Sequence, residues 1–73
     1  MSTSLLKIEL TPRQAAILTL VAQGETSKKI AQRLGINRES VDICLMRLFR
    51  KTDTSSRAQL VGYALTHNLI PPA

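Results

Sequence analysis

Residues 28–37 read Lys-Lys-Ile-Ala-Gln-Arg-Leu-Gly-Ile-Asn, and this stretch decides the fold. Ile30, Ala31 and Leu34 recur at the spacing of one face of a helix. Gly35 follows directly and can adopt the positive φ that a tight turn requires. The stretch therefore predicts a short helix that ends in a turn.

A second helix is predicted after this turn. Asn37 is placed to cap it, and the helix can run over residues 38–52. Ile36 and Val41 supply apolar side chains that fix the angle between the two helices, and Ala31 is small where the helices cross closely. A helix, a tight turn with glycine and a second helix together predict a helix-turn-helix.

The helix predicted over residues 38–52 has two chemically different faces. Placing residues 100° apart gathers one set on one side: Val41, Cys44, Leu45, Leu48 and Thr52. The other side carries Glu39, Ile43, Met46 and Arg50, flanked by Asp42 and Arg47. We expect the first set in the core and the second set at the surface.

The whole chain is predicted as four helices, over about residues 11–23, 27–34, 38–52 and 56–67. Capping residues mark their starts: Thr11 with Pro12 and Gln14 as a capping box, Thr26, Asn37, and Ser55 or Ser56. Left-handed or stop residues mark three ends: Gly24, Gly35 and Asn68. Residues 1–9 and 71–73 are predicted as tails, with Leu5, Leu6 and Ile8 apolar in the first tail and Leu10 apolar just before the first helix. The sequence thus predicts one all-α domain over residues 1–73, a compact four-helix domain containing a helix-turn-helix.

The inward faces of the outer two helices follow from the same spacing. The first helix should bury Gln14, Ile17, Leu18 and Val21, with Leu20 beside them. The last should bury Val61, Ala64 and Leu65, with Leu69 and Ile70, and carry Leu60, Tyr63 and His67 to one side. These sets predict one shared core of aliphatic side chains.

The positive charge is concentrated in the middle of the chain. The formal net charge is +5 over 73 residues. Residues 28–57 carry eight basic and three acidic side chains, so 8 − 3 = +5, and this segment holds the whole excess. Such a concentration fits a polyanion partner such as nucleic acid, although a solvated cationic face has the same composition.

Composition also argues against several classes of protein. One cysteine, Cys44, and one histidine, His67, cannot form a disulfide or a usual four-ligand zinc site, so we expect no metal and no cofactor. No apolar run is long enough to span a membrane and no signal peptide is visible, which makes the cytoplasm the expected location. No catalytic pair or phosphate-cradling glycine loop is present, so we do not expect an enzyme.

Several motifs at fixed spacing carry a resemblance to a known family. They are Leu10-Thr11-Pro12-Arg13, Leu20-Val21-Ala22-Gln23-Gly24, residues 28–36, Ser40-Val41, Phe49-Arg50-Lys51, and residues 55–61. Over about residues 10–70 the chain resembles the LuxR/GerE-type DNA-binding domain, which is also the output domain of NarL/FixJ-type response regulators. The resemblance implies a transcriptional regulator of double-stranded DNA.

The resemblance further implies where DNA and a second subunit bind. It implies that the third helix enters the major groove and that a homodimer forms through the fourth helix. The family's backbone-contacting positions fall on Thr26, Ser27, Lys28, Ser40 and Lys51, and we add Lys29 and Arg38 as neighbouring cations. The predicted dimer contacts are Leu60, Tyr63, Ala64 and His67.

The chain departs from the family pattern at informative positions. Gln14 stands where the family usually has glutamate, and Asp42 where it usually has lysine. An anion facing phosphate should cost about 1 kcal/mol of affinity. Thr52 and Thr54 replace apolar residues, which should loosen the joint between the third and fourth helices.

The side chains predicted to face the groove have different uses. Ile43 and Met46 can touch a thymine methyl, and Glu39 can accept from cytosine N4. Arg47 and Arg50 can donate to guanine or to phosphate. An exposed Ile-Met pair flanked by charge also suits a protein interface.

Other readings stay open at this point. A lone domain with these substitutions could act as an antagonist that binds a related regulator instead of DNA. Asp42 could pair with Arg38, Arg57 could be structural, and Cys44 is expected as a small core residue.

Overall fold

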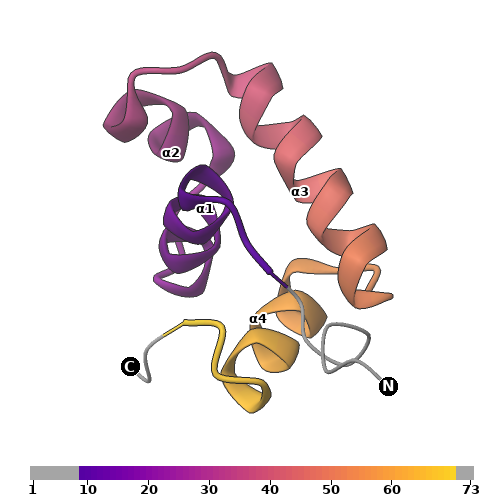
Figure 1. Cartoon of the computed structure of the whole chain (residues 1–73). Helices are drawn as coiled ribbons and strands as arrows, with labels where there is room; N and C mark the ends of the chain where they lie inside the picture. Colours follow the sequence, from indigo (N-terminus) through magenta and orange to yellow (C-terminus); the bar gives the residue numbers. More distant parts are fainter. Residues whose placement is uncertain (1–8, 71–73) are drawn as a thin grey trace.

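Four helices account for most of the structure, a computed structural model that describes residues 9–70 (Figure 1). They are α1 (Pro12–Ala22), α2 (Ser27–Leu34), α3 (Arg38–Thr52) and α4 (Arg57–Thr66). No strand occurs in this described part, which confirms the predicted all-α class. The tail predicted at 71–73 and most of the one at 1–9, with Leu5, Leu6 and Ile8, lie outside the described residues.

The helices α1 and α3 organise the fold. Each of them packs against all three of the other helices. Figure 1 shows α3 along one side of the molecule. The connection from α2 leads into its first residues, and α4 lies near its last turn. This arrangement leaves one long side of α3 uncovered.

A single aliphatic core joins the four helices. Its fully buried side chains are Ile17, Leu18, Ile30, Val41, Leu48, Leu60 and Ala64. Cys44, Leu45 and Thr52 complete the buried face of α3, so the face predicted from 100° spacing is confirmed. Gln14 is also buried with Ile17, Leu18 and Val21, as the spacing of α1 predicts.

Local capping explains where the first two helices begin and end. The Thr11 hydroxyl accepts from the Gln14 backbone N–H, and Gln14 Oε1 accepts from the Thr11 N–H, each at 3.1 Å. Gly35 ends α2 with φ +67°, and the Ile36 N–H donates to the Ala31 carbonyl at 3.0 Å. The predicted capping box and the left-handed glycine of the turn are both confirmed.

Two local predictions need correction. Asn37 occupies the N-cap position of α3, but its side chain makes no capping hydrogen bond. In α4 the inward face is rotated from the predicted one, because Leu60 is fully buried whereas Leu65 is 43% exposed. Apolar residues occur on several sides of α4, so its spacing alone does not select the side that packs.

The joint between α3 and α4 is hydrogen-bonded. Thr52 is buried, and its hydroxyl donates to the Leu48 carbonyl at 2.8 Å. The Thr52 and Thr54 hydroxyl oxygens also lie 2.8 Å apart. These bonds offset the burial of polar atoms that led us to expect a loosened joint. The turn itself is made by Asp53, which adopts a left-handed φ of 54°.

Candidate nucleic-acid interface

The uncovered side of α3 carries six exposed side chains, which we call its outer face: Glu39, Asp42, Ile43, Met46, Arg47 and Arg50. Ile43 is 47% and Met46 55% exposed. The opposite face of the helix is buried in the core. The outer face is therefore a mixed apolar and charged surface, with two acidic and two basic side chains, available to a partner.

The start of α2 brings further cations toward the turn. The Thr26 hydroxyl accepts from the Lys29 N–H at 3.2 Å, and the Lys28 and Lys29 side chains are exposed. A shallow recess of about 560 Å³, which we call the α2 recess, brings together Thr26, Lys28 and Arg38. Helix N-termini offer unpaired N–H groups and a positive dipole end, both of which favour an anion.

Ser27 has a structural role that the sequence prediction missed. Its side chain is buried, and its hydroxyl accepts a hydrogen bond from the Arg57 guanidinium. The same guanidinium donates to the Glu25 carbonyl at 3.2 Å. The Ser27 hydroxyl thus faces inward, and the phosphate contact predicted at this position stays a prediction. Arg57 instead ties the start of α4 to the α1–α2 connection.

Lys51 is directed toward α1. Its ammonium donates to the Glu9 carbonyl oxygen at 2.8 Å and to Gln14 Oε1 at 3.2 Å. Both partners are far away in the sequence, so no local pattern signals this contact. The Lys51 charge remains at the surface but is shared with these two acceptors.

The acidic departure at Asp42 has a partner one helical turn earlier. Arg38 Nε lies 3.9 Å from the Asp42 carboxylate, and both side chains are more than half exposed. Such an exposed pair stabilises the helix by only a few tenths of a kcal/mol. The pair matters more for the charge of the surface, because Arg38 partly compensates the negative charge of Asp42 on the outer face.

The predicted dimer residues of α4 fall into two groups. Leu60 and Ala64 are fully buried in the core of this chain, and their contact with a second subunit stays a prediction. Tyr63 and His67 reach the surface and stack, with ring centroids 3.9 Å apart and an interplanar angle of 17°. Leu65, which the sequence placed inside, is 43% exposed.

The comparisons with known proteins bear on this geometry. Residues 9–64 match the family described as bacterial regulatory proteins, luxR family, a range that includes α1, α2, α3 and most of α4. The chain belongs to the LuxR family of bacterial regulatory proteins. The motifs quoted from its sequence thus identified the family correctly.

The LuxR-family relatives are regulators by name. The chain is 49% identical over 65 residues to a probable transcriptional regulator, ycf29, of Cyanophora paradoxa, covering 89% of this chain and 31% of the relative. It is 44% identical over 64 residues to response regulator Rre1 of Synechocystis, covering 88% and 28%. It is 36% identical over 61 residues to the transcriptional regulatory protein LiaR of Bacillus subtilis, covering 84% and 29%. The chain thus spans about three tenths of the length of these relatives.

The described part of this LuxR-family chain has no helix with the length and apolarity that a membrane crossing requires. Its longest helix is α3, with 15 residues.

Proposed function

We propose that this chain binds double-stranded DNA as a transcriptional regulator or as the output domain of one, with α3 in the major groove. The observation that carries the proposal is the outer face of α3, which is uncovered and lies next to the cationic start of α2. A single helix fits the width of the major groove. Membership of the LuxR family supports the same conclusion.

Two sets of residues make different contacts with the DNA, one with the backbone phosphates and the other mainly with the bases. The α2 recess, with Thr26, Lys28 and Arg38, supplies the donors for backbone phosphates, and Lys29 adds charge beside it. On the outer face, Arg47 and Arg50 donate to guanine or phosphate, Ile43 and Met46 touch thymine methyls, and Glu39 accepts from cytosine N4. The first set positions the protein, and the second set discriminates between sequences.

A homodimer through α4 completes the proposal. The half-buried Tyr63 and the exposed His67 stack and form a small amphipathic surface on this helix. A second copy placed on this surface would bring two α3 helices to two half-sites of one duplex. The buried Leu60 and Ala64 would support the surface from within rather than touch the partner.

Fluorescence anisotropy with a labelled duplex, repeated across a salt series, tests the proposal. We expect the logarithm of the association constant to fall linearly with the logarithm of the salt concentration, because bound phosphates release counterions. Lys28→Gln should reduce the slope by about 0.9, the value for one phosphate contact. Arg33→Gln removes the same charge from the end of α2, where Arg33 pairs with Glu25 at 3.1 Å, and should leave the slope unchanged.

A second candidate function is that of an antagonist that binds a related regulator. The exposed Ile43 and Met46 beside Asp42 favour it, since apolar surface flanked by charge is typical of a protein interface. If a folded sample failed to bind duplex DNA even at low salt, the DNA-binding proposal would be contradicted. Capture of a full-length relative, lost on Ile43→Ser, would then support the antagonist.

A further inference from the structure

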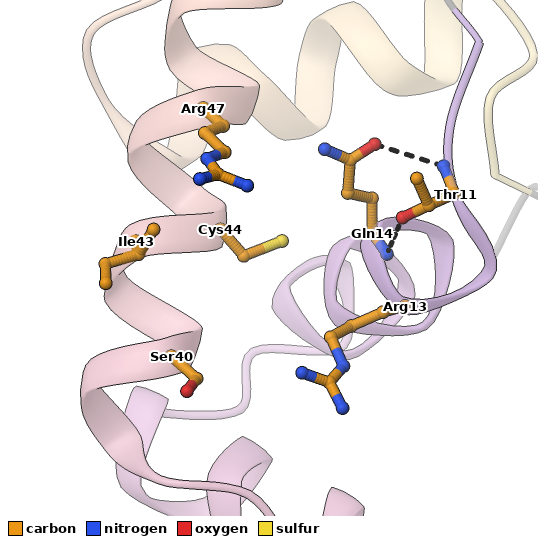
Figure 2. Close-up of a pocket in the computed structure, with 7 residues that line it drawn as sticks. All are labelled: Thr11, Arg13, Gln14, Ser40, Ile43, Cys44 and Arg47. Carbon is orange, nitrogen blue, oxygen red and sulfur yellow. Dashed lines mark hydrogen bonds between the residues drawn. The ribbon is translucent and has the colours of Figure 1, made fainter.

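A second cavity, which we call the α1–α3 cavity, lies between the start of α1 and the middle of α3. Its volume is about 270 Å³. Figure 2 shows Arg13 and Gln14 of α1 facing Ser40, Cys44 and Arg47 of α3 across it. The volume is at or below the lower end of the range for drug-sized ligands, so the cavity suits a group of a few heavy atoms.

The charged groups around the α1–α3 cavity are both cationic donors. Arg13 and Arg47 contribute guanidinium groups, and within residues 9–70 neither group has a hydrogen-bonding or ion-pairing partner. Ser40 adds a hydroxyl. None of the residues lining the cavity is acidic. This donor set is suited to a phosphate group, because guanidinium groups bind phosphate oxygens in pairs.

Gln14 adds a donor from a buried position. Its side chain is 9% exposed, and its Oε1 is already occupied by the Thr11 N–H and the Lys51 ammonium. The amide nitrogen consequently points away from these donors, toward Arg47 in Figure 2. The hydrogen bonds to Oε1 therefore fix the direction in which the amide N–H groups are presented to the cavity.

The buried Cys44 thiol lies in the same positive environment. Burial raises its pKa, while Arg13, Arg47 and Lys51 act in the opposite direction. The thiol is therefore neutral at neutral pH, and the three cations leave a positive potential at the cavity. A neutral thiol at this position does not repel an anion.

The place of the α1–α3 cavity relative to the outer face suggests the source of the anion. Ile43 and Arg47 belong to both, so the cavity opens at the edge of the surface that we propose lies in the major groove. A helix in the major groove is flanked by the sugar-phosphate backbone. A backbone phosphate is therefore the anion that reaches this edge when DNA binds.

We infer that the α1–α3 cavity binds one phosphate of the DNA backbone, with Arg13 of α1 and Arg47 of α3 clamping it. The inference rests on the proposed DNA binding and extends the interface to α1. Arg13 is then a DNA contact outside the helix-turn-helix. Ser40 and the Gln14 amide supply neutral donors to the same phosphate.

The first test compares Arg13→Gln with Arg33→Gln in the anisotropy salt series. Arg13→Gln should weaken duplex binding about fivefold at low salt and lower the salt slope by about 0.9, whereas Arg33→Gln should change neither. If the unmodified protein binds DNA and Arg13→Gln matches the Arg33→Gln control, the inference is overturned and the proposed function stands. If the unmodified protein does not bind DNA, the proposed function itself fails.

The second test uses Cys44 and needs no variant. Bound duplex should slow the alkylation of Cys44 by iodoacetamide at least severalfold, because a phosphate in the cavity would block access to the thiol. An unchanged rate at saturating duplex would contradict the inference even if Arg13→Gln failed to fold.

A free anion is distinguished from a backbone phosphate by titrating inorganic phosphate into DNA-free protein. The shifts of the Arg13 Nε–H and Gln14 amide resonances in ¹H–¹⁵N spectra report its binding. Weak, unsaturated binding is expected. Saturation at micromolar phosphate, together with an unchanged DNA salt slope in Arg13→Gln, would assign the cavity to a free anion and overturn the inference.

Discussion

The ammonium of Lys51, in the last turn of α3, lies 3.2 Å from Oε1 of Gln14, in the first turn of α1. The same oxygen accepts the Thr11 N–H of the capping box at 3.1 Å. One glutamine side chain therefore caps α1 and holds the end of α3 against it. The family usually has glutamate at this position, and glutamine keeps the acceptor without its charge.

Lys51→Met should lower the free energy of unfolding by about 1 kcal/mol. The variant loses two charge-assisted hydrogen bonds, one to Gln14 and one to the Glu9 carbonyl, and partial exposure reduces what each contributes. Urea denaturation followed by circular dichroism measures the change. Lys29→Met, at an exposed position of α2, removes the same charge and should leave stability nearly unchanged. Equal effects of the two substitutions would contradict the structural role of Lys51.

Arg57→Met should destabilise the fold by about 1–3 kcal/mol and leave the DNA salt slope unchanged. The substitution leaves the buried Ser27 hydroxyl and the Glu25 carbonyl without their donor. Thermal unfolding gives the stability, and anisotropy gives the slope at a temperature where the variant is folded. A slope reduced by one counterion, with little loss of stability, would instead make Arg57 a phosphate contact.

Asp53→Gly should stabilise the protein by about 0.5–1 kcal/mol. Asp53 has φ 54°, and glycine adopts this left-handed conformation without steric cost. Gly35→Ala provides the opposite control, because Gly35 has φ 67° and would gain a strained Cβ. Its midpoint of urea unfolding should fall. A lower midpoint for Asp53→Gly would show that the aspartate side chain stabilises this turn more than its backbone strain costs.

Asp42→Lys should raise duplex affinity about tenfold at low salt and increase the salt slope by about one counterion. The substitution replaces an anion on the outer face with a cation and removes the weak pair with Arg38. Asp42→Asn separates the two effects, since it removes the negative charge without adding a positive one. An unchanged affinity in both variants would place Asp42 away from the bound DNA.

The Cys44 thiol should react slowly with iodoacetamide at neutral pH. Burial raises its pKa above the ordinary value of 9.0, so the reactive thiolate is scarce until the pH is higher still. Because the unfolded chain loses this proton first, stability should decline as the pH rises through 9. Mass spectrometry at pH 7 measures the rate of Cys44 alkylation in the native protein and in the urea-unfolded protein. Equal rates would contradict a buried, neutral thiol.

Local sequence determined most of the secondary structure. The Thr11 capping box, the Thr26 cap and the left-handed Gly35 depend on atoms within a few residues of one another, which the sequence places directly. The buried face of α3 followed from its helical period, because Val41, Cys44, Leu45 and Leu48 recur at the spacing of one side. The family motifs identified the LuxR family for the same reason. They contain these capping, turn and core residues in a fixed order along the chain.

Tertiary packing decided the features that join distant segments. It buried Leu60 and exposed Leu65, because α4 carries apolar residues on more than one side and only contact with α1 and α3 selects among them. It turned Ser27 inward to Arg57, 30 residues away, and Lys51 toward Gln14, 37 residues away. The α1–α3 cavity likewise exists only where two helices meet. Periodicity and capping act within about one helical turn, whereas these contacts depend on how whole helices pack.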